Sequence, residues 1–354
     1  MTAERQLRFW LVGLALFLLA VYLLRGVLLP FVAGMAVAYL LDPACDRLEK
    51  WGCSRTLATA LVTAAFVLLV AAALVVLAPM LQAQVVDLAA RLPGYIETLQ
   101  GRAQPLLRLL EERLSAGDLA QLRGAAGGQA GNVVGWIGNA LGKLLSGGLA
   151  LVNVLSLVFI TPIVAFYLLR DWDRLVARID GWLPRRNAAA IREQVRLIDR
   201  TLAGFVRGQA TVCLLLGLFY GIGLGLIGLD FGLAVGLFAG FLSFVPFLGS
   251  IVGFVAGVGL ALAQFSDWLP VAGVAALFVV GQAIEGNLLT PKLVGDRVGL
   301  HPVWVIFAVL AGGLLFGFVG VLLALPMAAV VGVLVRFALQ RYLDSRYYGG
   351  GGAA

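Results

Sequence analysis

Long uncharged stretches of apolar side chains constrain this chain more than any other feature of its sequence. Residues 9–24 and 57–78 contain no charged side chain at all. A stretch of about 20 apolar residues is what an α-helix needs to cross the hydrocarbon core of a bilayer. Charged residues make up only 13% of the chain, against roughly 25% in a typical soluble domain. The chain is therefore predicted to be an all-α polytopic membrane protein.

Further apolar stretches follow along the chain, and its length leaves room for roughly six to ten membrane elements. The predicted spans lie at about 9–24, 26–41, 56–78, 149–169, 209–229, 231–265, 269–284 and 303–335. Residues 79–148 differ, because charged and apolar side chains alternate there at near-helical spacing. This segment is predicted to be an amphipathic helical insertion outside the bilayer core.

Basic residues indicate how the predicted spans are oriented. Nine arginines fall within residues 170–207. Cytoplasmic loops of membrane proteins carry an excess of Lys and Arg, so this segment is predicted to be a cytoplasmic loop. Counting crossings from it places residues 79–148 on the opposite face and both chain termini in the cytoplasm. The same rule explains the net charge of +7 without a nucleic-acid partner, because no basic, aromatic-interleaved patch stands out.

Two of the apolar stretches, 231–265 and 303–335, are too long for a single crossing. A helix of about 35 residues would exceed roughly 50 Å, whereas the bilayer core is about 30 Å thick. Each stretch is therefore predicted to be a helical, re-entrant hairpin, which also returns the following basic residues to the cytoplasmic side. The predicted tips, which would meet substrate, are Pro246, Phe247, Gly249 and Ser250 in the first hairpin and Gly312, Gly313 and Gly317 in the second.

The two hairpins suggest an inverted repeat in the carboxy-terminal half. A helix plus a hairpin occupies about 209–265, and a second such pair, of opposite topology, occupies about 269–335. Inverted repeats with broken helices are common in secondary transporters, although glycines also let helices pack closely in any membrane bundle. The predicted parts are 1–78 (three transmembrane helices), 79–148 (insertion), 149–207 (fourth helix and Arg-rich segment), 208–338 (transport core) and 339–354 (cytoplasmic tail).

Glu285 is the main candidate for an ion-coupling residue. Only six charged residues occur between positions 208 and 335, and a charge that faces lipid is costly. Glu285 lies late in an apolar stretch, between Gln282 and Asn287. A buried carboxylate there could exchange a proton or a cation as access alternates. The alternative is a carboxylate at headgroup level that pairs with Lys292 or Arg297.

Two other titratable positions each have a functional and a structural interpretation. Asp230 could bind a cation directly, or it could mark the outer interface together with Asp267. His301 is the only histidine and could titrate near neutral pH. A histidine in a loop before Pro302 could equally cap the helix that follows.

Enzymatic alternatives fail on the residue inventory. One histidine cannot supply the His-Glu-x-x-His pair of a metalloprotease. The three cysteines, Cys45, Cys53 and Cys213, have neither the number nor the spacing of a disulfide scaffold or zinc module. No Gly-rich phosphate loop occurs, and the serines of the apolar region lack a base. The chain is therefore predicted to be no enzyme and to need no metal or cofactor.

Several short motifs in the carboxy-terminal half carry a family resemblance. They are Gly208-Gln209, residues 221–229, Val245-Pro246-Phe247-Leu248-Gly249, Glu285-Gly286-Asn287, Pro291, Val298-Gly299-Leu300-His301-Pro302 and residues 320–326. With these motifs the chain resembles the autoinducer-2 exporter family of bacterial membrane proteins over most of its length. The resemblance implies a multi-pass protein of the bacterial inner membrane. It adds Gln209, Pro291, His301 and Pro302 as family-motif positions.

The residues and the resemblance together leave several functions open. Family members include exporters of a quorum-sensing furanone and sodium/proton antiporters. The first hypothesis is a secondary transporter that exports a small polar, autoinducer-2-like solute, coupled to an ion gradient through Glu285. The alternatives are a sodium (lithium)/proton antiporter, a non-transporting scaffold and an oligomeric pore. The expected partners are the lipid bilayer, a small polar solute and/or sodium ions and protons, and the family is compatible with a homo-oligomer.

Overall fold

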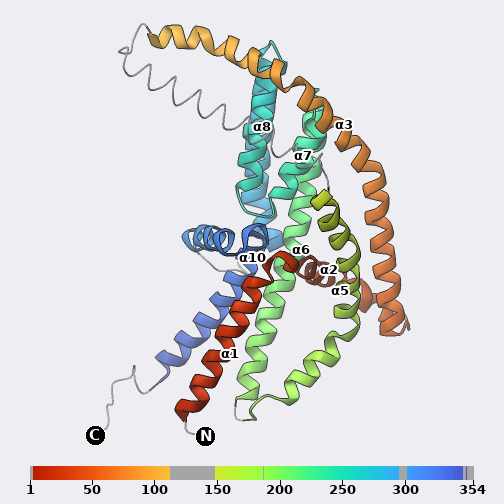
Figure 1. Cartoon of the computed structure of the whole chain (residues 1–354), viewed down its shortest axis with the longest axis vertical. Coiled ribbons are helices and arrows are strands. Elements are labelled where there is room, and N and C mark those ends of the chain that lie inside the picture. The colour runs from red at the N-terminus through yellow and green to blue at the C-terminus, as the bar shows by residue number, and fades with distance from the viewer. Residues whose placement is uncertain (1–2, 112–147, 186, 295–300, 346–347, 349–354) are drawn as a thin grey trace. The chain divides into compact units, whose positions relative to one another are not determined.

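The computed structural model describes residues 3–111, 148–185, 187–294, 301–345 and 348, and every regular element within these ranges is a helix (Figure 1). The elements are α1 (Ala3–Leu23), η1 (Arg25–Val27, a 3₁₀ helix), α2 (Leu28–Lys50), α3 (Arg55–Glu111), α5 (Gly148–Gly181), α6 (Ala188–Ile227), α7 (Gly232–Leu242), α8 (Leu248–Gln264), α9 (Trp268–Ile284), η2 (Glu285–Val294, a π-helix) and α10 (Pro302–Leu343). Six helices in the described ranges are long and apolar enough to cross a membrane: α2, α3, α5, α6, α9 with η2, and α10. A helix satisfies its own backbone polar groups, which a bilayer core requires. The predicted helical, polytopic class is confirmed at this level.

Several helices continue well beyond the apolar stretches that predicted them. α3 has 57 residues, so it is about 85 Å long at 1.5 Å per residue. It runs without a break from the third apolar stretch into the described part of the predicted insertion, 79–111, and the rest of that insertion, 112–147, lies outside the described residues. Hydropathy detects only the apolar part of such a helix.

Most of the Arg-rich segment 170–207, predicted to connect two spans in the cytoplasm, is helical. Its first part belongs to α5, which ends at Gly181, and its last part belongs to α6, which begins at Ala188. Arg, Leu and Ala are good helix formers, so the helices persist after the apolar residues end. The segment is therefore mostly helical, because charge density reports exposure to water and not the backbone conformation, and its cytoplasmic placement stays a prediction.

The chain divides into two compact units that are each assembled from distant parts of the sequence. The first unit consists of Met1–Val67, Ser156–Thr211 and Leu288–Ala354, and the second of Leu68–Leu155 and Val212–Asn287. Each unit therefore depends on contacts that a scan along the chain does not detect.

Arg55 joins three helices of the first unit. It lies at the start of α3, and its Nε donates to the Leu169 carbonyl oxygen on α5 at 2.9 Å. Its two terminal amino groups pair with three carboxylates on one face of α2, each at 2.9 Å: Asp42, Asp46 and Glu49. The rigid five-donor fork of a guanidinium can serve several acceptors at once. Arg55 of α3 therefore links α3 to both α2 and α5.

Gly317 interrupts α10, also in the first unit, with a non-helical backbone (φ 60°, ψ −138°). Eight residues of straight helix would separate Gly312 from Gly320 by about 12 Å. Their backbones are instead in direct contact, and a Cβ atom on either would collide with the carbonyl group of the other. The chain therefore bends back on itself at Gly317, within the glycine-rich stretch predicted to break.

A short break separates α7 from α8 in the second unit, and the two helices pack side by side (Figure 1). Pro246 lies in the break, where it supplies no backbone donor. Phe247 follows with a left-handed backbone (φ 67°) and leads into α8. Gly249 allows the close approach of the two helices, because a Cβ atom there would collide with Ala239 and Ser243 of the preceding segment. The predicted break at Pro246 is therefore present.

Candidate functional site

Glu285 lies where α9 changes from an α-helix into the π-helix η2. The residue is only 5% exposed. Its Oε2 atom has no hydrogen-bond partner among the described residues. π-Helical segments are rare and frequently lie at functional sites, and a buried polar atom without a partner is costly. Glu285 therefore has the environment of a group that is kept for function.

Tyr220 on α6 adds a second unpaired polar atom to this part of the second unit. Its ring is fully buried and stacks on Phe278 of α9, with a centroid distance of 4.6 Å. Its hydroxyl group lies against Gly281, one turn before Glu285, and has no hydrogen-bond partner among the described residues. Tyr220 and Glu285 are close enough to interact electrostatically. The second unit thus buries an unpaired phenol hydroxyl group and an unpaired carboxylate oxygen.

Gln282 connects this region to the α7–α8 break. Its Oε1 atom is hydrogen-bonded to the hydroxyl group of Ser250, at the start of α8. The Ser250 hydroxyl also lies 3.1 Å from the carbonyl oxygen of Phe247. Phe247 has a left-handed backbone (φ 67°), which favours glycine, and it is 60% exposed. Residues with such strained backbone angles are concentrated at functional sites.

The structure brings together Glu285, Gln282 and the predicted tip residues around Ser250, but it places Asp230 elsewhere. Asp230 precedes α7 and accepts bonds from Arg91 and Tyr95 of α3, both at 3.1 Å. Its backbone nitrogen donates to Gln264 at the far end of α8. Fourteen residues of α8 separate Ser250 from Gln264, which is about 21 Å of helix. Asp230 therefore fastens the base of α7 to α3.

The remaining predicted positions lie outside this cluster of contacts. Asn287 is exposed and donates to the Ala283 carbonyl oxygen of its own helix at 2.9 Å. Pro291 lies inside η2. His301 caps α10, since its Nδ1 accepts from the nitrogen of Val303, and Pro302 is the first helical residue. Gln209 is buried on α6.

Sequence reasoning missed Tyr220, although one signal was available. Tyr220 is the only tyrosine between positions 208 and 335, a region otherwise poor in polar side chains. A lone phenol in an apolar helix usually needs a polar partner for its hydroxyl group.

No three His, Cys, Asp or Glu side chains of the described ranges lie close enough to hold a metal ion.

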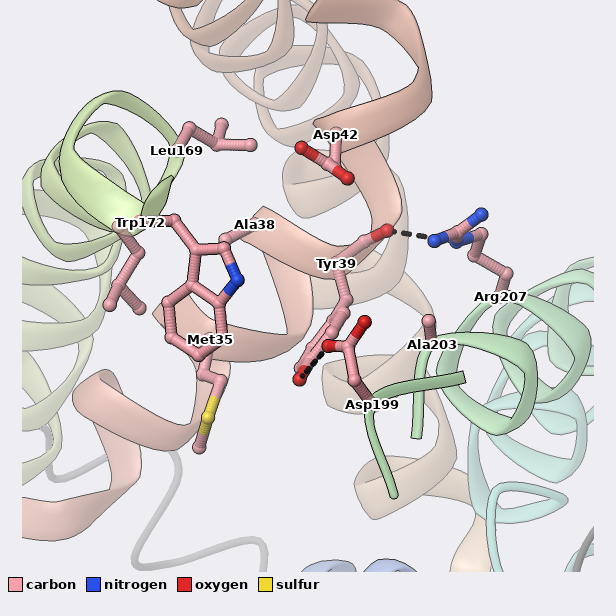
Figure 2. Close-up of a pocket in the computed structure, with 10 residues that line it drawn as sticks. Met35, Ala38, Tyr39, Asp42, Leu169, Trp172, Asp199, Ala203 and Arg207 are labelled. Atoms are coloured by element: carbon pink, nitrogen blue, oxygen red, sulfur yellow. Dashed lines mark hydrogen bonds between the residues drawn. The ribbon is translucent and has the colours of Figure 1, made fainter. Parts of the chain in front are cut away.

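A small pocket in the first unit was also not predicted (Figure 2). Figure 2 shows Tyr39 at its centre, with the Tyr39 hydroxyl group donating to Asp199 at 3.0 Å. The guanidinium Nε of Arg207 donates to the Tyr39 carbonyl oxygen at 3.0 Å. Trp172 covers the apolar side of the pocket, with its ring edge-on to Tyr39. Tyr39 is thus hydrogen-bonded to one acidic and one basic side chain of α6, Asp199 and Arg207.

Comparison with known proteins identifies the family. The model described as "AI-2E family transporter" matches residues 11–340 of the chain. The chain belongs to the AI-2E transporter family. It is 28% identical to "Putative transport protein YrrI" of Bacillus subtilis (strain 168) over 95% of this chain and 97% of the relative. It is 27% identical to "Putative permease PerM" of Escherichia coli (strain K12) over 89% and 88% of the two chains.

Membership of the AI-2E family gives the buried polar groups a context. Polar and charged side chains inside membrane-spanning helices are rare, and in transporters they mark the pathways of substrates and ions. In this AI-2E family member, the unpaired oxygen of Glu285 can take up a proton or a small cation. Gln282 and Ser250 link that oxygen's helix to the break beside Pro246.

Proposed function

We propose that this AI-2E family member is a secondary transporter that exports a small polar solute, of the autoinducer-2 kind, across the bacterial inner membrane. Glu285 is the coupling carboxylate in this proposal. The observation that carries it is the buried residue Glu285, whose Oε2 has no partner among the described residues. The relatives' names, which speak of transport and of a permease, support the general class.

The coupling follows from the cost of burying charge. A carboxylate inside apolar helices is stable when it is protonated or paired with a cation, and unstable when it is charged and alone. The protonated and cation-bound forms can therefore cross between access states, whereas the bare charged form cannot. A transporter that moves only in the occupied forms exchanges its solute against an ion gradient.

The two helix interruptions supply the moving or gating parts in this proposal. The α7–α8 pair and the two halves of α10 around Gly317 would be re-entrant hairpins of an inverted repeat, with both chain termini in the cytoplasm. Broken helices near the bilayer midplane expose backbone dipoles to a bound solute. The tip residues Pro246 to Ser250 and Gly312 to Gly317 would line the solute path.

Proton flux in vesicles tests the proposal. Purified protein is reconstituted with a pH-sensitive dye inside, and the furanone signal is added outside. We expect flux with the parent protein and none with Glu285→Gln, because an amide keeps the shape but cannot carry a proton. Asp267→Asn is the matched control, since Asp267 is an exposed carboxylate at the other end of α9. Normal flux in Glu285→Gln would refute the site assignment.

A sodium/proton antiporter is the second candidate. It is favoured by the oxygen atoms that converge near α9: Gln282 Oε1 and Ser250 Oγ are in contact, and Glu285 follows one turn later. Hard cations such as sodium prefer oxygen ligands. Flux that is triggered by sodium alone, and lost in Glu285→Gln, would select the antiporter.

A scaffold and an oligomeric pore remain the alternatives to coupled transport. A scaffold would be indifferent to Glu285→Gln but strongly impaired by deletion of residues 84–123, which include part of α3. An uncoupled pore would pass solute without moving protons. The same vesicle measurement, repeated with the deletion variant and with a solute assay, separates these outcomes.

A further inference from the structure

A cavity of about 840 Å³ lies in the first unit beside α6, and it is lined by an excess of positive charge. Arg200 and Arg207 of α6 and Lys292 of η2 contribute three cations, against the single carboxylate of Asp199. Ligand sites typically have volumes of about 300–1,000 Å³. The cavity is therefore large enough for a small anion or for the phosphate of a lipid headgroup.

The carboxylate and one of the cations are already positioned by the protein. Asp199 accepts the hydroxyl proton of Tyr39, so part of its hydrogen-bonding capacity is used (Figure 2). Arg207 uses one donor, its Nε, on the Tyr39 carbonyl oxygen. A guanidinium has five N–H donors. Its terminal amino groups have no partner among the described residues and can serve a ligand.

The other two cations, Arg200 and Lys292, are exposed, and neither has an ion pair with any residue that the structure describes. Some other arginines of the described ranges are paired, as Arg192 is with Asp180 at 2.6 Å. Clustered cations without counter-charges raise the local concentration of anions. Basic pockets between the helices of membrane proteins bind phosphate-bearing headgroups for this reason.

Small residues make room for a ligand beside these charges. Ala203 and Gly204 line the cavity along α6 between Arg200 and Arg207, and Gly208 lines it directly after Arg207. Residues three to four apart share a helix face, so the cations flank a stretch with almost no side-chain volume. We infer that this cavity binds a phosphate-class anion, either free in solution or as the headgroup of an anionic lipid. The inference does not rest on the proposed coupling role of Glu285.

Two binding measurements on the full-length protein test the inference and separate the two sources of phosphate. Inorganic phosphate is titrated calorimetrically into purified protein at constant ionic strength. Retention of phosphatidylglycerol is measured by native mass spectrometry after release from phosphatidylcholine nanodiscs that contain it. Each cation near a membrane surface is expected to contribute roughly fivefold in affinity. Arg200→Gln combined with Lys292→Gln should therefore weaken binding roughly 25-fold.

Two further variants make the result specific. Arg196→Gln is the matched control, because Arg196 is an exposed arginine of α6 that does not line the cavity, and it should bind like the parent. Asp199→Asn keeps an acceptor for Tyr39 while removing the negative charge, so it should tighten anion binding roughly fivefold. Asp199→Asn also tests the site if the double variant fails to fold.

The outcomes are distinct. Calorimetric binding of phosphate that the double variant loses assigns the cavity to a soluble anion, and selective loss of phosphatidylglycerol assigns it to a lipid headgroup. Both results support an anion site. Equal effects of the double variant and Arg196→Gln would overturn the inference. Weaker binding in Asp199→Asn would overturn it as well, because it would show that the carboxylate attracts the ligand.

Discussion

The hydroxyl group of Ser250 on α8 is hydrogen-bonded to Oε1 of Gln282 on α9, three residues before Glu285. The single proton of this hydroxyl is shared with the Phe247 carbonyl oxygen, 3.1 Å away. Residues three apart on a helix share a face. The segment between α7 and α8 is therefore joined, through one side chain, to the helix turn that carries the buried carboxylate.

Removing this link should slow transport measurably at a small cost in stability. Ser250→Ala deletes one neutral hydrogen bond, which contributes about 1 kcal/mol to folding. If the link positions Glu285 in the rate-limiting step, a comparable loss of about 1 kcal/mol would slow flux about fivefold. Both effects are measured on purified protein, by thermal unfolding and by vesicle flux.

A double-mutant cycle decides whether Ser250 and Gln282 act together. Gln282→Leu should have a similar effect on flux, and the combination with Ser250→Ala should add little, because both changes remove the same interaction. Fully additive effects of the two changes would show that the residues act independently.

Gly281 is expected to be indispensable for packing Tyr220 against α9. A Cβ atom there would lie 2.6 Å from Cζ of Tyr220, closer than real atoms approach. Gly281→Ala should therefore destabilise the protein by about 1–3 kcal/mol through overpacking. Gly286→Ala is the matched control, since nothing lies within 4 Å of its Cβ position. Similar unfolding temperatures for the two variants would contradict the buried position of Tyr220.

Gly317 tests whether the bend in α10 depends on backbone freedom. Its dihedral angles (φ 60°, ψ −138°) are accessible almost only to glycine, while its Cβ position is sterically open. Gly317→Ala should therefore cost at least about 1–3 kcal/mol from strain alone. Gly259→Ala on α8, also open but with an ordinary backbone, should not destabilise and could gain about 0.5–1 kcal/mol. Equal stability of both variants in thermal unfolding would argue against the bend.

The proposed membrane topology is tested by chemical labelling. Asp296→Cys is made in a background that lacks Cys45, Cys53 and Cys213. The positive-inside rule places the neighbouring basic residues in the cytoplasm, so an impermeant thiol reagent should label this cysteine only in inside-out vesicles. Labelling in intact cells would contradict the hairpin model, because a single crossing by residues 231–265 would place this position outside.

Much of the architecture was predictable because it depends on local properties. The helix break at Pro246 follows from proline chemistry, and the bend near Gly317 follows from glycine in a stretch too long for one crossing. Glu285 stood out because carboxylates are rare in apolar helices. By contrast, the unbroken continuation of α3 from its apolar part into the insertion, and the helical state of residues 170–207, were not predicted. A length of apolar residues marks where a helix can cross the bilayer and not where the helix ends.

The sequence by itself determined that the chain is helical, that it is built for a bilayer, where two helices are interrupted and which buried carboxylate is available. These properties follow from apolar length, backbone freedom and the cost of charge, which act over a few neighbouring residues. Only the tertiary structure decided what each polar group meets. It placed Tyr220 against Gly281, bound Asp230 to Arg91, and set Tyr39 between Asp199 and Arg207, positions 160 residues or more from Tyr39. Such partners are chosen by close packing between distant segments, for which no short sequence pattern exists.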